Sequence, residues 1–136
     1  MNLEEMYKEL EYEGIRVIIM DLLGIESMSM GKNIGLDYSV THSSGNELVH
    51  LATQWGHIEN GDFYNQNSSQ IIRILSDARA QKYAFKKLLP HEKNMEAVDK
   101  GYTEVYQIAE YWNLPYDFTE RACFYDINGY LMPRAV

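Results

Sequence analysis

The chain has 136 residues, of which 46% are hydrophobic and 24% charged, a balance typical of one globular domain with a single core. Its formal net charge of -8 weighs against proteins that coat nucleic acids or bind anionic membranes, because both of these ligands attract Lys and Arg. The single cysteine, Cys123, excludes an intrachain disulfide and a cysteine-rich zinc site.

The N-terminal segment indicates a protein of the cytoplasm. Residues 1–14 are acidic and lack the basic start and the apolar run of a signal peptide. No segment of the sequence approaches the roughly 20 apolar residues that span a membrane. We therefore expect a cytoplasmic protein that does not bind membranes.

The N-terminal part of the chain predicts a helix followed by a small sheet. Apolar residues recur at helical spacing over residues 3–10, and Gly14 is a plausible end for this helix. Residues 15–20 (IRVIIM) are rich in β-branched side chains and predict a strand. Residues 28–30 and 34–38 alternate about a glycine-containing turn, which predicts a hairpin.

The rest of the chain is predicted to be helical. Ser43 or Ser44 is a candidate N-cap for a helix over residues 46–58. The polar stretch 59–69 predicts a surface loop, and a long helix over residues 70–89 ends before a proline. Three shorter helices complete the chain, over residues 92–100, 103–112 and 116–126.

These elements predict one domain over residues 1–136. The expected fold class is α+β, with a small antiparallel sheet near the N-terminus. This sheet packs on a mostly helical core that ends in the C-terminal helices.

The segment that carries chemistry is residues 51–57 (LATQWGH), within the predicted helix 46–58. A zinc-peptidase helix carries two histidines at positions i and i+4, with a glutamate directly after the first. Both imidazoles then bind one metal ion, and the glutamate takes a proton from the metal-bound water. His57 stands at the second histidine position, but Thr53 stands at the first and Gln54 at the glutamate position.

A second segment lies in the predicted long helix, where residues 77–84 (DARAQKYA) are followed by LLP. Asp77, Ala80 and Ala84 share one helical face, on which small residues let another helix approach closely. Together with residues 51–57, this segment resembles the ImmA/IrrE-type zinc metallopeptidases of phages and other mobile elements. The opening helix, strand and hairpin and the tail TEVYQIAEYWNLPYDFTERACFY also resemble short members of that family, so the resemblance covers nearly the whole chain.

The resemblance implies a zincin-like core and assigns Asp77 to the position of the third zinc ligand. His57 and Asp77 are then vestigial metal ligands, and Thr53 marks the lost one. Considered without the resemblance, Asp77 is equally well explained as a solvent-exposed carboxylate on the outer side of its helix.

The two substituted positions argue against catalysis. Gln54 has no titrating oxygen and cannot act as the general base. Thr53 is too short and too weak a ligand to replace an imidazole. His57 and Asp77 supply two ligands where a catalytic zinc ion needs three. We therefore expect no catalytic residue and no cofactor, with zinc bound only if another residue rescues the site.

Polar residues form a continuous stripe along the predicted helix 46–58: Glu47, His50, Thr53, Gln54 and His57. The stripe is either a solvated helix face or the floor of an inherited substrate cleft. We favour the cleft, because in the family that the chain resembles this face looks into the substrate groove. Glu47 and His50 extend the predicted cleft beyond the motif itself.

An active metal-dependent peptidase with a rearranged site remains an alternative, built from His50, His57 and Asp77. His50 and His57 are separated by about 10.5 Å of helix rise, so a shared metal needs unusual geometry. A less favoured alternative is a non-zinc cation site at His57, Glu59 and Asp62.

The C-terminal helices provide another alternative, a DNA-binding regulator, because residues 103–126 resemble a helix-turn-helix. The second helix carries one basic residue against three acidic ones, namely Arg121 against Asp117, Glu120 and Asp126. A recognition helix this negative would repel phosphate, so packing explains these helices better.

The leading hypothesis is therefore a pseudoenzyme, a non-catalytic relative of the ImmA/IrrE-type metallopeptidases encoded by a phage or mobile element. Active members of that family are associated with the cleavage of helix-turn-helix repressors, so the resemblance implies a repressor-type protein partner. Nucleic acid and membranes are not expected partners.

Overall fold

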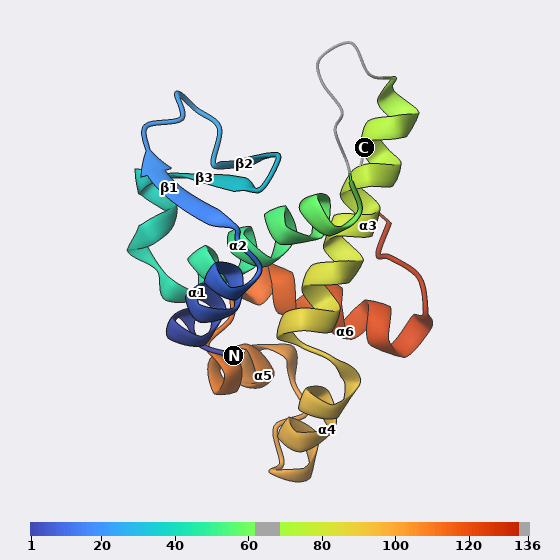
Figure 1. The fold of residues 1–136 in the computed structure, drawn as a ribbon. Helices are drawn as coiled ribbons and strands as arrows, with labels where there is room; N and C mark the ends of the chain where they lie inside the picture. The colour runs from blue at the N-terminus through green and yellow to red at the C-terminus, as the bar shows by residue number, and fades with distance from the viewer. Residues whose placement is uncertain (62–68, 134–136) are drawn as a thin grey trace.

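The α+β class is confirmed by the computed structural model, which describes residues 1–61 and 69–133 (Figure 1). Helix α1 (Leu3–Tyr12) comes first and is capped by Asn2, whose side chain accepts a hydrogen bond from the Glu5 amide. Three strands follow near the N-terminus: β1 (Arg16–Met20), β2 (Ser27–Met30) and β3 (Asn33–Asp37). The predicted helix, strand and hairpin are all present.

The sheet is mixed, and the prediction of a purely antiparallel sheet was wrong in this respect. Its strand order is β1-β3-β2, with β2 and β3 forming the antiparallel hairpin and β1 running parallel to β3. The chain reverses direction twice between β1 and β3, which makes those two strands parallel. Strand β3 takes the centre because its Ile34 and Leu36 are fully buried, whereas β2 (SMSM) lies at an edge.

Helices make up the rest of the described chain. The 3₁₀ helix η1 (Tyr38–His42), which the sequence did not predict, leads to the long helices α2 (Ser44–Glu59) and α3 (Gln70–Leu88). Three shorter helices then follow: α4 (His91–Asp99), α5 (Val105–Trp112) and α6 (Tyr116–Asn128). Most of the predicted loop over residues 59–69 lies outside the described residues. In the part of the chain that is described, no helix has the length and apolar character needed to cross a membrane.

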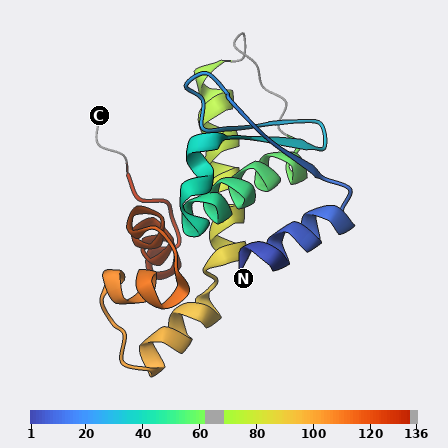
Figure 2. The same ribbon diagram turned by 90° about the vertical axis from the view of Figure 1, so that its left-hand side faces the viewer.

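Helix α2 occupies the middle of the fold, between the sheet and α3 (Figures 1 and 2). Its apolar face is buried, at Leu48, Leu51, Ala52 and Trp55. The Ser43 side chain caps the helix by accepting a hydrogen bond from the Asn46 amide. Figure 2 shows the C-terminal helices gathered on the side away from the sheet.

Helices α2 and α3 approach closely at Gly56. A Cβ atom built on Gly56 would lie 3.0 Å from both the Cα and the carbonyl oxygen of Ala80, and 3.0 Å from the Cβ of Tyr83. Ala80 and Ala84 are both fully buried, and Ala80 lies in this contact, in line with the close approach predicted from the small residues on that face. The residue directly before His57 therefore sets the spacing between the two helices that carry the predicted site.

Candidate functional site

A cavity of about 460 Å³ opens over one face of α2. Helix α2 supplies one side of it, and another is formed by Ser27, the first residue of β2, with Glu26 directly before it. Helices α3 and α6 complete the walls. The remaining lining residues are Asn46, Val49, His50, Thr53, Gln54 and His57 from α2, Asp77 and Gln81 from α3, and Pro115, Asp117, Phe118 and Arg121 from the start of α6.

This cavity brings together the four positions that the sequence comparison with a zinc-peptidase helix singled out: Thr53, Gln54, His57 and Asp77. His50 also lines it, as predicted for a cleft residue. The C-terminal helix α6 was not expected here. Sequence reasoning placed α6 by its helical pattern alone, which does not tell which neighbours its polar residues face.

His57 and Asp77 face each other across the α2–α3 contact. The Nε2 atom of His57 lies 3.5 Å from Oδ1 of Asp77, and its Nδ1 atom lies 3.2 Å from the hydroxyl of Ser76. His57 and Ser76 are buried, whereas the Asp77 side chain is 49% exposed. Asp77 thus combines the two predicted placements, because it reaches solvent and also turns toward the histidine.

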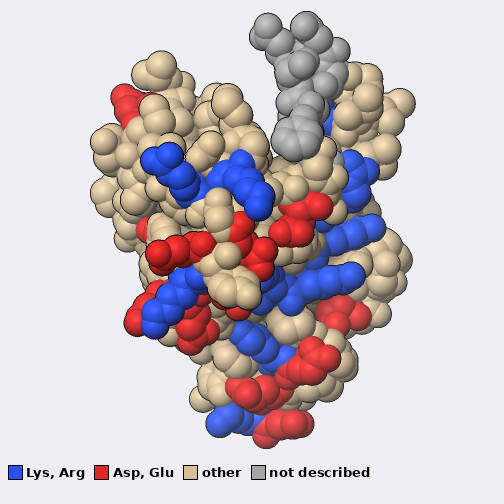
Figure 3. All heavy atoms as spheres, viewed as in Figure 1, with Lys and Arg blue, Asp and Glu red and all other residues tan. Residues whose placement is uncertain are grey.

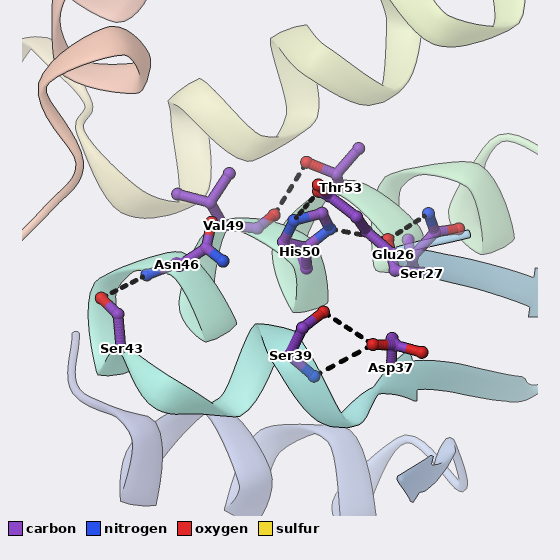
Figure 4. Close-up of polar contacts among 10 residues, drawn as sticks. Glu26, Ser27, Asp37, Ser39, Ser43, Asn46, Val49, His50 and Thr53 are labelled. Carbon is purple, nitrogen blue, oxygen red and sulfur yellow. Dashed lines mark hydrogen bonds and ion pairs between the residues drawn. The ribbon is translucent and has the colours of Figure 1, made fainter. Parts of the chain in front are cut away.

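Thr53 is turned back onto its own helix (Figure 4). Its hydroxyl donates a hydrogen bond of 2.8 Å to the carbonyl oxygen of Val49, one turn earlier. The carbonyl oxygen four residues earlier is the usual hydrogen-bond acceptor for a threonine hydroxyl inside a helix. The hydroxyl therefore does not complete a ligand set with His57 and Asp77.

The residues present do not fit a catalytic zinc ion. Within residues 1–61 and 69–133, no group of three His, Cys, Asp or Glu side chains is placed to hold a metal ion. The rearranged site proposed for His50, His57 and Asp77 is not formed, because both ring nitrogens of His50 contact residues at the start of β2. No catalytic step through a metal follows from this arrangement.

Gln54 takes part in a chain of hydrogen bonds that ties α2 to β2. Its Nε2 atom donates to the Ser27 hydroxyl at 3.0 Å. The Ser27 hydroxyl lies 2.7 Å from Nδ1 of His50, and Nε2 of His50 lies 3.0 Å from Oε2 of Glu26 (Figure 4). An amide nitrogen can only donate, which leaves the Ser27 proton for His50 Nδ1 and the His50 Nε2 proton for Glu26.

This directed chain holds His50 in its neutral form. Burial lowers the pKa of His50 below the usual value of 6.5, although the nearby Glu26 carboxylate acts in the opposite direction. Neutral His50 accepts at Nδ1 and donates at Nε2, which is what its two neighbours require. Sequence reasoning missed Glu26 and Ser27, because the alternation in this segment predicted a hairpin but not which element its polar side chains would face.

Glu47 does not line the cavity, although it was predicted as a cleft residue. Its carboxylate is buried and accepts a hydrogen bond of 2.6 Å from the Tyr7 hydroxyl of α1. The polar stripe on α2 is wide, and Glu47 lies at the edge of the stripe that faces α1. Burial and the Glu47 carboxylate both raise the pKa of Tyr7, so the tyrosine stays a donor.

The non-zinc cation site at His57, Glu59 and Asp62 is not assembled by the described residues. Glu59 accepts a hydrogen bond of 3.0 Å from the indole nitrogen of Trp55. Asp62 lies outside the described residues.

Helix α6 is a wall of the cavity and part of the core. Phe118 and Ala122 are buried, while Asp117 and Arg121 line the cavity. On the face shown in Figure 3, Lys and Arg side chains are interspersed with Asp and Glu. Duplex DNA binding relies on clustered basic residues, so neither this face nor α6 favours the DNA-binding alternative.

No protein-family model, curated protein or solved structure matches this chain.

Proposed function

We propose that the protein is a non-catalytic relative of the ImmA/IrrE-type zinc metallopeptidases that binds a segment of a partner protein in the cavity over α2. One observation carries the proposal, the meeting of four motif positions in this cavity: Thr53, Gln54, His57 and Asp77. These positions come from two helices and correspond to the metal and catalytic positions of the family that the chain resembles.

The contacts of the two substituted residues support a binding role without catalysis. Gln54 cannot take a proton from water, and its amide nitrogen is engaged with Ser27. The hydroxyl of Thr53 is engaged with the carbonyl oxygen of Val49. Both side chains therefore serve the local structure of α2 and its contact with β2.

The shape of the site supports a peptide as the ligand. A cavity of about 460 Å³ lies within the range of ordinary ligand sites, which is roughly 300–1,000 Å³. Strand β2 borders this cavity and lies at an edge of the sheet, with no further strand beside it among the described residues. An extended segment can hydrogen-bond to such an edge while its side chains enter the cavity.

The partner class follows from the resemblance. We infer that the partner is a helix-turn-helix repressor encoded by the same phage or mobile element. The two proteins would bind each other in the cytoplasm. An acidic protein with a net charge of -8 is suited to a DNA-binding partner, whose surface is basic.

Titration calorimetry with such a repressor tests the proposal. We expect binding without cleavage in the presence of one equivalent of zinc, and loss of binding in Gln81→Trp, which fills the cavity from α3. The matched control is Lys86→Trp, at an exposed position of the same helix. Stoichiometric zinc at His57, together with peptidase activity that disappears in His57→Ala, would refute the non-catalytic assignment.

A further inference from the structure

We propose that Arg121 anchors a carboxylate of the peptide that binds in the cavity over α2. This inference rests on the proposed function, because it names the chemistry of the segment that the cavity takes. The carboxylate comes from an Asp or Glu side chain or from the C-terminus of the peptide.

Arg121 lies at the wall of the cavity, and its Nε atom has no hydrogen-bond partner among the described residues. Among the described residues that line this cavity, it is the only Lys or Arg. That Nε atom is buried, and none of the ion pairs formed between described residues includes the Arg121 guanidinium. A buried N–H group without an acceptor is costly, and more so when it belongs to a charged group. An acceptor supplied by a ligand would remove part of this cost.

The carboxylates already present in the cavity have other roles. Glu26 lies 3.0 Å from His50, and Asp77 lies 3.5 Å from His57. Asp117 stands one turn before Arg121 but forms no ion pair with it. Asp117 lies in the first turn of α6, where a negative charge stabilises the positive end of the helix. The guanidinium is thus left for an external anion.

A carboxylate fits this position better than a phosphate. The planar guanidinium donates two parallel hydrogen bonds to a carboxylate, and this geometry selects for it. Asp77 and Asp117 also line the cavity, so a doubly charged phosphate would meet more repulsion than a singly charged carboxylate.

The test is an NMR titration of the ¹⁵N-labelled full chain with matched peptides. The probes are a blocked alanine pentapeptide with a central aspartate, its asparagine counterpart, and an all-alanine pentapeptide with either a free or an amidated C-terminus. The readouts are the Nε–H signal of Arg121 and the backbone amides of the cavity residues. We expect the aspartate peptide or the free-acid peptide to bind about tenfold more tightly than its neutral counterpart. If the aspartate peptide binds more tightly, the carboxylate comes from a side chain. If the free-acid peptide binds more tightly, it comes from the C-terminus of the peptide.

Variants separate this inference from the proposed function. Arg121→Gln should abolish the preference for the carboxylate, and Arg16→Gln, on β1 outside the cavity, should keep it. If the native protein binds charged and neutral peptides equally, the Arg121 inference fails and the peptide-binding function stands. If none of the peptides shifts the cavity signals, both fail. The comparison on the native chain holds even if Arg121→Gln does not fold.

Discussion

The Nε2 atom of His57 on α2 lies 3.5 Å from the Oδ1 atom of Asp77 on α3. This relationship depends on the close crossing of the two helices, which Gly56 and Ala80 allow. The crossing therefore brings the side chains of His57 and Asp77 together.

Replacing Gly56 by Ala should destabilise the protein by about 1–3 kcal/mol, because the added Cβ would press on the backbone of Ala80. Urea unfolding followed by circular dichroism measures this change. The sign is diagnostic, since Gly→Ala inside an exposed helix normally stabilises by about 0.5–1 kcal/mol. A stabilised variant would show that the two helices do not pack as described.

The native histidines should titrate in a defined order. The pKa of His50 lies below 6.5 because of burial, and the pKa of His91 is raised by its hydrogen bond and attraction to Asp126. For stability, the His91–Asp126 contribution is present below pH 6.5 and is lost as pH rises through the folded-state pKa. The His50 contribution has the opposite sign, since protonating it below pH 6.5 favours the unfolded chain. NMR titration of the imidazole signals measures both, and the reverse order would contradict the described surroundings.

Changing Gln54 to Glu should raise the pKa of His50. A glutamate oxygen accepts the Ser27 proton, so His50 Nδ1 must then donate to Ser27, which requires the protonated ring. The new carboxylate also attracts the imidazolium directly. The measurement is the same NMR titration, with Gln81→Glu as the control for an added charge in the cavity. An unchanged His50 pKa in the Gln54 variant would mean that the hydrogen-bond chain is not formed.

Tyr7→Phe should destabilise the protein by about 1–3 kcal/mol, because it leaves the Glu47 carboxylate buried without its hydrogen-bond donor. The matched control is Tyr12→Phe in the same helix, where the side chain is 88% exposed and little change is expected. Urea unfolding of both variants provides the comparison. Equal stability of the two variants would show that Glu47 does not depend on α1.

Much of the fold could be predicted because its signals are local. The apolar stripe of α2, the strand after α1 and the hairpin are all set by residues close together in the sequence. The parallel pairing of β1 with β3 was missed because strand order depends on which strand buries its side chains, here Ile34 and Leu36. Periodicity within one strand does not contain that information.

The candidate site was predicted in part for the same reason. His57 and Asp77 could be matched by position within their helices, and the structure brings them into one cavity. Ser27 reaches the cavity from β2, Glu26 from the residue before β2, and Arg121 from α6. No local pattern connects those segments with α2. Sequence spacing also could not show that the side chain of Gln54 would be held by Ser27.

The most direct test of the central claim is zinc binding by the double variant Thr53→His and Gln54→Glu, measured by calorimetry and metal analysis. We predict one zinc ion per folded chain, bound by the new histidine with His57 and Asp77, and an affinity at least about tenfold lower when Asp77→Ala is added. The native chain should bind no stoichiometric zinc under the same conditions. A folded double variant with the zinc affinity of the native chain would contradict the assignment of this cavity as a former metal site.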